Sequence, residues 1–224
     1  MGAFSVFAKY FAFAFSALLP VVNPVGSALI LLGLVGDAPA LVYHDLAKKI
    51  AVRTVLVFVV IEFAGAVLLT FFGISLPVVQ VAGGLVLVSI GWNLLNQQYS
   101  ETNQTQANVT ATSLDSVQQQ VFYPLTFPIT VGPACIVVML TLSARAAGKS
   151  TTEDVIAHLG ILAAVIALSV LVFFFYANAP RITRRVSPQT AHGILRVIAF
   201  VLLCIGVQIA STGVQTLLRA ALKP

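Results

Sequence analysis

The sequence has 224 residues, of which 59% are hydrophobic and only 8% are charged, whereas a soluble domain carries roughly 25% Asp, Glu, Lys and Arg. So few charged side chains cannot cover a surface that faces water, which excludes a water-soluble globule and makes the lipid bilayer the expected solvent. The formal net charge is +5. The basic residues do not form the stripe with interleaved aromatics that is typical of nucleic-acid-binding proteins, so no nucleic-acid partner is expected.

Six apolar segments follow one another along the chain, each long enough to cross a hydrocarbon layer that takes about 20 helical residues. They cover residues 4–35, 52–72, 77–95, 121–142, 155–177 and 193–218. Backbone N–H and C=O groups cannot stay unpaired in lipid, so we expect an all-α membrane protein with six transmembrane helices. The stretch 36–53 holds five charged residues and is expected to be a loop.

A polar tract at residues 97–120, rich in Gln, Asn, Ser and Thr, separates two predicted halves, 1–96 and 121–224. Each half holds three apolar segments. Three crossings make the second half begin on the opposite membrane face, so two similar halves would be related by inverted topology. The side with the N-terminus holds five of the twelve Lys and Arg residues, and the other side holds seven. Because cytoplasmic loops carry the excess of these residues, we expect both termini outside the cytoplasm.

Internal similarity supports a repeat with two interrupted helices. The first segment contains Leu-Pro-Val-Val-Asn-Pro-Val-Gly at residues 19–26, and the fourth contains Phe-Pro-Ile-Thr-Val-Gly-Pro-Ala at residues 127–134. Proline removes a backbone donor and collides with the preceding turn, so these motifs predict discontinuous first and fourth helices. A single proline usually only kinks a helix, but paired interruptions at corresponding positions of two halves point to the site of a secondary transporter.

The third and sixth segments are also similar to each other. Residues 87–94 match residues 202–209, with Gly91 and Gly206 at equivalent positions. Small residues at a helix interface let two backbones approach closely. These glycines, together with Gly84, are therefore expected to lie where helices are in close contact.

A discontinuous helix at membrane depth exposes groups that suit a zwitterion. The part that follows each break begins with free N–H groups and a positive dipole end, which favour a carboxylate, and the carbonyls that end the preceding part favour an ammonium group. The candidate substrate-binding residues are Asn23, Pro24, Gly26, Thr130, Gly132 and Pro133. The Thr130 hydroxyl has two interpretations, a contact to the ligand or a donor to backbone that the break has freed.

Glu62 lies near the middle of the second segment, where a charge is costly unless it is protonated, paired or facing a cavity. It is either a carboxyl group that couples transport to a proton or a sodium ion, or a neutral acid hydrogen-bonded to a neighbouring helix. Three histidines near segment ends lack metal-ligand spacing and are expected to be solvated: His44, His158 and His192. The aromatic run 173–176 is expected to face lipid or the interface. No metal, cofactor or enzyme active site is expected.

Several motifs, in this order and spacing, resemble the MarC family of six-span bacterial membrane proteins. They are Asn23-Pro24-Val25-Gly26, residues 72–75, 82–84 and 124–133, and Arg196 with Gln208 and Gly213. The resemblance extends over about residues 11–216, the polar tract excepted. It implies a bacterial inner-membrane protein with two inverted three-helix repeats, and uptake or exchange of small neutral amino acids such as glycine and alanine, driven by an ion gradient. The sequence departs from the family pattern at Ser27, Leu29 and Ala199.

An exporter of another small amphiphilic metabolite or drug is the alternative, and it would require a wider and more aromatic cavity. A channel is disfavoured, because the sequence shows neither a ring of charges nor a filter-like run of carbonyls. The expected partners of a transporter are its amino acid, a coupling proton or sodium ion, and membrane lipids. The sequence indicates no particular oligomeric state.

Overall fold

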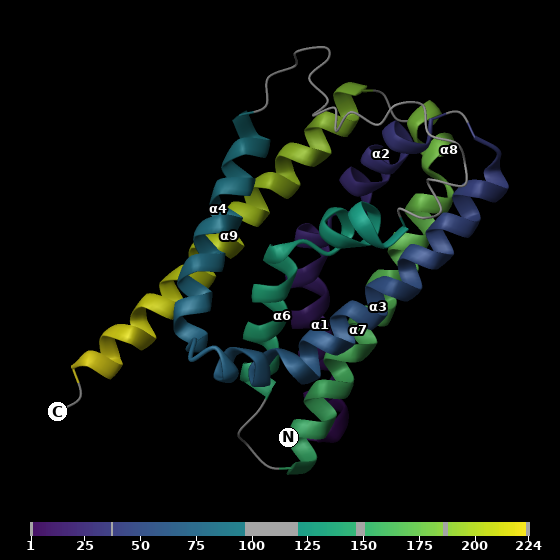
Figure 1. Cartoon of the computed structure of the whole chain (residues 1–224). Helices are drawn as coiled ribbons and strands as arrows, with labels where there is room; N and C mark the ends of the chain where they lie inside the picture. Colours follow the sequence, from purple (N-terminus) through teal and green to yellow (C-terminus); the bar gives the residue numbers. More distant parts are fainter. Residues whose placement is uncertain (1, 37, 97–120, 147–150, 186–187, 223–224) are drawn as a thin grey trace.

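The computed structural model describes residues 2–36, 38–96, 121–146, 151–185 and 188–222, and the regular structure within these ranges is helical (Figure 1). The elements are α1 (Ala3–Val22), α2 (Pro24–Val35), α3 (Ala40–Phe71), α4 (Leu76–Asn96), η1 (Val121–Thr130), α6 (Pro133–Ala146), α7 (Thr151–Ala177), α8 (Ala179–Arg185) and α9 (Pro188–Ala221). The polar tract 97–120 lies outside the described residues.

Five stretches are long and apolar enough to cross a membrane. They are Ala3–Val35, which joins α1 and α2, then α3, α4 and α7, and finally Gly193–Ala221 of α9. The pair η1 and α6 has the required length and composition together, although its two parts are bent by 63° at the break between them. The prediction of an all-helical membrane protein is therefore confirmed, with five spans or, counting the bent pair, six.

The second span begins earlier than its hydropathy indicated. α3 starts at Ala40, so the predicted loop over residues 36–53 is wrong for most of its length. The first turns of α3 bury one face, made of Tyr43, Leu46, Ala47 and Ile50. Asp45 and Lys49 form an ion pair of 2.7 Å on the side that stays partly exposed. Asp45, Lys48 and Lys49, three of the charged residues that favoured a loop, thus lie on the polar face of an amphipathic helix.

α4 and α9 lie side by side (Figure 1), because glycines let their backbones meet. A Cβ atom added at Gly84 would lie 2.6 Å from the backbone nitrogen of Ala210, and one at Gly206 would lie 2.8 Å from the Gly84 carbonyl oxygen. One at Gly91 would lie 2.9 Å from the backbone nitrogen of Leu203. The predicted role of these glycines in close helix contact is therefore confirmed.

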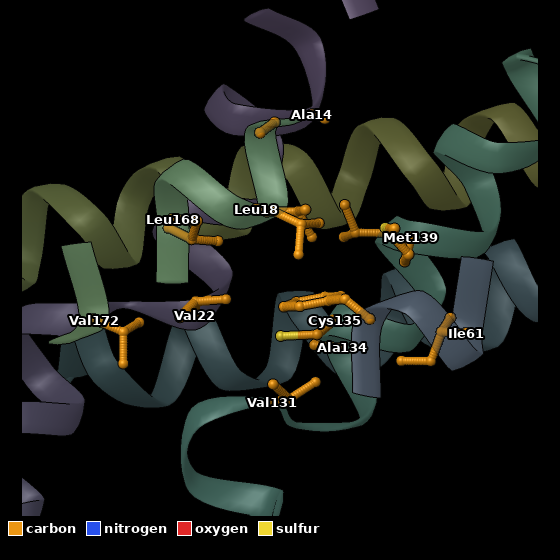
Figure 2. Close-up of a cluster of buried hydrophobic side chains, with 14 of the residues drawn as sticks. Ala14, Leu18, Val22, Ile61, Val131, Ala134, Cys135, Met139, Leu168 and Val172 are labelled. Atoms are coloured by element: carbon orange, nitrogen blue, oxygen red, sulfur yellow. The ribbon is translucent and has the colours of Figure 1, made fainter. Parts of the chain in front are cut away.

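The buried core lies among α1, α3, α6 and α7, with α7 packed against both α1 and α3. Figure 2 shows its centre, where apolar side chains converge around the start of α6; the labelled members include Leu18, Val22, Val131, Ala134, Cys135 and Met139. Large apolar side chains on the outer faces, such as Phe63 and Phe174, are 61% and 56% exposed. Such faces suit contact with lipid, which is as apolar as they are.

Candidate functional site

The first break lies at Asn23, between α1 and α2. The backbone of Asn23 is left-handed, with φ 46° and ψ 64°, a conformation that asparagine adopts more readily than most residues. Pro24 begins α2, where its missing N–H costs no helical hydrogen bond and its fixed φ suits the first turn. The Asn23 side-chain oxygen accepts a hydrogen bond of 3.1 Å from the Gly26 N–H. Asn23 therefore caps the helix that follows the break.

The second break is longer than the first. Tyr123 and Phe127 have extended backbone inside η1, with ψ of 125° and 126°, because each precedes a proline and the proline ring disfavours helical backbone in the residue before it. Val131 and Gly132 then separate η1 from α6, which begins at Pro133. In Figure 1 η1 runs across the bundle, whereas α6 runs along it.

Side-chain donors pair with carbonyls near both breaks. Four side chains donate to the carbonyl oxygen five residues earlier: Ser27 to Val22 at 3.0 Å, Thr126 to Val121 and Thr130 to Leu125 at 2.7 Å each, and the Cys135 thiol to Thr130 at 4.0 Å. A buried carbonyl left without a donor costs about 1–3 kcal/mol. Of the two interpretations of the Thr130 hydroxyl, the structure records the donor to backbone, and a contact to a ligand stays a prediction.

Ser27 also joins the two breaks to each other. Its hydroxyl lies 3.4 Å from the carbonyl oxygen of Ile129 in η1, as well as 3.0 Å from that of Val22. In a continuous helix the Ile129 carbonyl would accept the N–H of residue 133, which is a proline and has none. A serine hydroxyl has one hydrogen to donate, so the two carbonyls share it. The start of α2 is thereby held against the end of η1.

Tyr176 of α7 completes a buried polar cluster with Ser27 and Thr130. Its hydroxyl lies 2.8 Å from the Thr130 hydroxyl, and the Ser27 side chain is close enough to interact with it. Tyr176 is 1% exposed, so the expectation that it faces lipid or the interface is wrong. Sequence reasoning missed both Ser27 and Tyr176 as site residues. The available signal was the hydroxyl that ends a run of three phenylalanines, since a buried tyrosine usually finds a hydrogen-bond partner.

The six predicted substrate-binding residues all lie at the two breaks, which Ser27 brings together. Pro24 and Thr130 are buried, Asn23, Gly26 and Gly132 are partly buried, and Pro133 is exposed. The surroundings are apolar, with Val22, Val131 and Ala134 among the neighbouring side chains (Figure 2). Sites for small molecules are usually lined by apolar side chains and contain a few polar groups that form hydrogen bonds. The binding roles of the six residues stay predictions.

Glu62 has its partners on other helices. Its Oε1 atom lies 2.5 Å from Nδ1 of His158 in α7, and its backbone carbonyl accepts a hydrogen bond of 3.4 Å from the Ser143 hydroxyl of α6. The Glu62 side chain is fully buried, whereas that of His158 is 26% exposed. The expectation that His158 is solvated without a carboxylate is therefore wrong. The two residues are 96 positions apart, so only the packing of α3 against α7 reveals the pair.

A cavity of about 420 Å³ lies between α1, α6 and α9. Its wall is mostly apolar, and its polar members include Thr141, Arg145 and Gln208. Residues 23–27 and 129–133 do not line it. The cavity is therefore separate from the two breaks, most of whose residues are buried or partly buried in this structure.

Apolar outer faces, up to six spans and a buried polar cluster at two interrupted helices define this chain as a multi-span integral membrane protein. The chain belongs to the MarC family, described as "MarC family integral membrane protein", which matches residues 8–218. This confirms the resemblance drawn from the sequence motifs. The chain is also similar to the inner membrane protein MarC of Escherichia coli K12, of strain UTI89 and of strain CFT073; each is 26% identical over 204 residues, which cover 90% of this chain and 92% of the relative. No solved structure matches the chain.

Proposed function

We propose that this protein is a secondary transporter of small neutral amino acids of the glycine and alanine class, located in a bacterial inner membrane as its relatives are named. The observation that carries this proposal is the contact between two interrupted spans, in which Ser27 of the first break reaches the Ile129 carbonyl of the second. Interrupted helices that meet inside a bundle are typical of transporter sites, because unpaired backbone there can bind ions and polar ligands.

Such a transporter would be built from two inverted repeats, residues 1–96 and 121–224. The interruptions support this arrangement because they fall in the first span of each half. The third spans of the two halves, α4 and α9, support it as well, since equivalent glycines lie in their shared interface. With six crossings both termini lie on one side, which the distribution of Lys and Arg makes the outer side.

The substrate would bind where helix ends supply opposite partial charges. Its carboxylate would dock on the N-terminal ends of α2 and α6, and its ammonium group on carbonyls that end α1 and η1. The Asn23 side-chain oxygen now accepts the Gly26 N–H, so it stands in for one carboxylate oxygen and would move aside when substrate binds. Once the Asn23 side chain has moved, the small residues Gly26, Gly132 and Ala134 would limit the substrate side chain to a hydrogen, methyl or hydroxymethyl group.

Transport would follow an alternating-access cycle in which one group of helices rocks around this site. An ion gradient would drive accumulation, with Glu62 as the candidate coupling residue. The alternative, an exporter of another small amphiphilic metabolite or drug, is favoured by one observation, the mostly apolar cavity of about 420 Å³, which is roomier than glycine or alanine needs.

The test is uptake of radiolabelled alanine and glycine into proteoliposomes that contain the purified protein. We expect saturable uptake that unlabelled serine inhibits and that leucine and phenylalanine do not. Empty liposomes and protein inactivated by heat are the controls. An absence of saturable uptake or exchange for every small amino acid, under both proton and sodium gradients, would reject the amino acid substrate. Altered drug resistance on deletion of the gene, without amino acid uptake, would favour the exporter.

A further inference from the structure

The buried pair formed by Glu62 and His158 joins the two halves of the chain. Glu62 belongs to α3 and His158 to α7, and their Oε1 and Nδ1 atoms are 2.5 Å apart. The second carboxyl oxygen of Glu62, Oε2, is buried and has no hydrogen-bond partner. Among the described residues, the ionisable group that contacts the Glu62 carboxyl is His158, and Ser143 of α6 is the other polar side chain beside it.

The burial of Glu62 favours binding of a proton by the pair. A carboxylate buried in an apolar interior with one of its oxygens unpaired is unfavourable, and adding a proton to the pair removes a net negative charge. The carboxyl and imidazole groups are joined by a short hydrogen bond, so one proton can move between Oε1 and Nδ1. The pair can therefore hold a proton as a unit.

The same pair is poorly suited to a divalent metal ion. A bound metal of this kind usually has at least three protein ligands, and the described residues contain no group of three or more His, Cys, Asp or Glu side chains that could hold one. A proton needs only the two groups that are present. The chemistry of the site therefore favours a proton over a divalent metal ion.

His158 is the partly exposed member of the pair, and Glu62 is the buried one. His158 is 26% exposed, and because Nδ1 is used by Glu62, Nε2 is the ring nitrogen left for water. His158 follows the acidic first turn of α7, which contains Glu153 and Asp154, by about one helical turn, or about 6 Å along the axis. The imidazole thus lies between the start of α7 and the buried carboxyl group, where a proton entering from that side would reach it first.

The pair also contacts the two helices that lie next to the second break. α6 begins at the second break and ends near Ser143, whose hydroxyl donates to the Glu62 carbonyl. α7 carries His158 near one end and Tyr176, the partner of Thr130, near the other. A shift of α6 or α7 relative to α3 would therefore change the surroundings of Glu62 and of the second break at the same time.

We propose that Glu62 and His158 together form the proton-binding site that couples transport to a proton gradient, loaded from the membrane side at which α7 begins. This inference rests on the proposed transport function. One proton moved with each amino acid supports about tenfold accumulation for each unit of pH difference.

The first experiment compares net accumulation with exchange of labelled alanine in proteoliposomes. Wild-type protein should accumulate alanine about tenfold per unit of inward pH gradient and should exchange alanine without a gradient. Glu62→Gln and His158→Gln should exchange alanine but accumulate none above equilibrium, and Glu153→Gln, which changes a carboxyl group in the first turn of the same helix, should behave as wild type. Accumulation by the two variants equal to wild type, their loss of exchange as well, or accumulation driven by sodium at equal pH would overturn the assignment.

A second measurement separates this inference from the substrate. Infrared difference spectra of the purified protein, recorded while the pH is varied, should show a protonated carboxyl band that disappears in Glu62→Gln and titrates at a different pH in His158→Gln. If the wild type moved no amino acid but showed this band, the proposed function would fail and the proton site would stand. If Glu62→Gln left the titrating carboxyl bands unchanged, the proton site would fail whatever the substrate.

Discussion

The Ser27 hydroxyl and the Ile129 carbonyl oxygen lie 3.4 Å apart, although the two residues are 102 positions apart in the chain. Their contact connects the two breaks. Pro133 cannot supply the N–H that this carbonyl would accept in a regular helix. The serine of one break therefore compensates for the proline of the other, and the two interruptions depend on each other in the folded protein.

Replacing this hydroxyl should separate the two breaks. Ser27→Ala leaves the Ile129 and Val22 carbonyls without their side-chain donor, at a cost of about 1–3 kcal/mol. We expect a lower melting temperature and slower alanine uptake. Ser16→Ala is the matched control, because the Ser16 hydroxyl donates to the Phe13 carbonyl on an exposed part of α1. Equal melting temperatures for the two variants would show that the Ser27 contact does not hold the breaks together.

Variants of Thr130 and Tyr176 can distinguish the hydrogen bond between η1 and α7 from the local hydrogen bond within η1. Thr130→Val removes both the hydrogen bond to Tyr176 and the one to the Leu125 carbonyl. Tyr176→Phe removes the bond to Thr130 and the contact with Ser27, and it leaves the bond to the Leu125 carbonyl in place. We expect Tyr176→Phe to lower the stability by about 1 kcal/mol and Thr130→Val to lower it by more, with reduced transport in both.

The double variant measures the coupling directly. If the two hydroxyls interact as their separation of 2.8 Å indicates, the effects of the single changes on the free energy of unfolding will not add. Additive effects would contradict a direct hydrogen bond. Normal transport by Thr130→Val would remove Thr130 from the substrate site.

Asn23 should respond differently to alanine and to glycine. Both changes remove the cap on the Gly26 N–H, which costs about 1 kcal/mol for alanine and only a few tenths of that for glycine. Alanine must also adopt the left-handed backbone of Asn23, at a further cost of about 1–2 kcal/mol, whereas glycine adopts it freely. The melting temperature should therefore be highest for wild type, lower for Asn23→Gly and lowest for Asn23→Ala. A substrate role predicts impaired uptake in both variants, so normal uptake by Asn23→Gly would contradict that role.

The contact between α4 and α9 should not tolerate one added methyl group. A Cβ atom at Gly84 would lie within 2.7 Å of backbone atoms of Ala210 and Gly206, so Gly84→Ala should force the helices apart and cost about 1–3 kcal/mol. Gly193→Ala on α9 is the control, because an added Cβ atom there meets nothing within 4 Å. Melting temperatures of the purified proteins test this, and a Gly84→Ala variant as stable as Gly193→Ala would contradict the close packing.

Much of the helical architecture could be predicted from local sequence. Apolar length identified the spans. The paired prolines predicted interruptions in the first and fourth, because a missing N–H and a ring clash act on the nearest turn whatever the fold. The clear error was at the start of α3, where charged residues indicated a loop. There the burial of Tyr43 and Ile50 by neighbouring helices made a helical face favourable, and hydropathy along the chain does not contain that information.

By itself the sequence determined the solvent, the helical class and the family, since each depends on composition or on interactions between near neighbours. Tertiary structure alone decided which groups share a site. Ser27 reaches Ile129, Tyr176 reaches Thr130, and Glu62 reaches His158, all across large separations in the chain. In an apolar interior a polar side chain must find a partner wherever packing places one, so its role follows from the neighbours that the fold supplies.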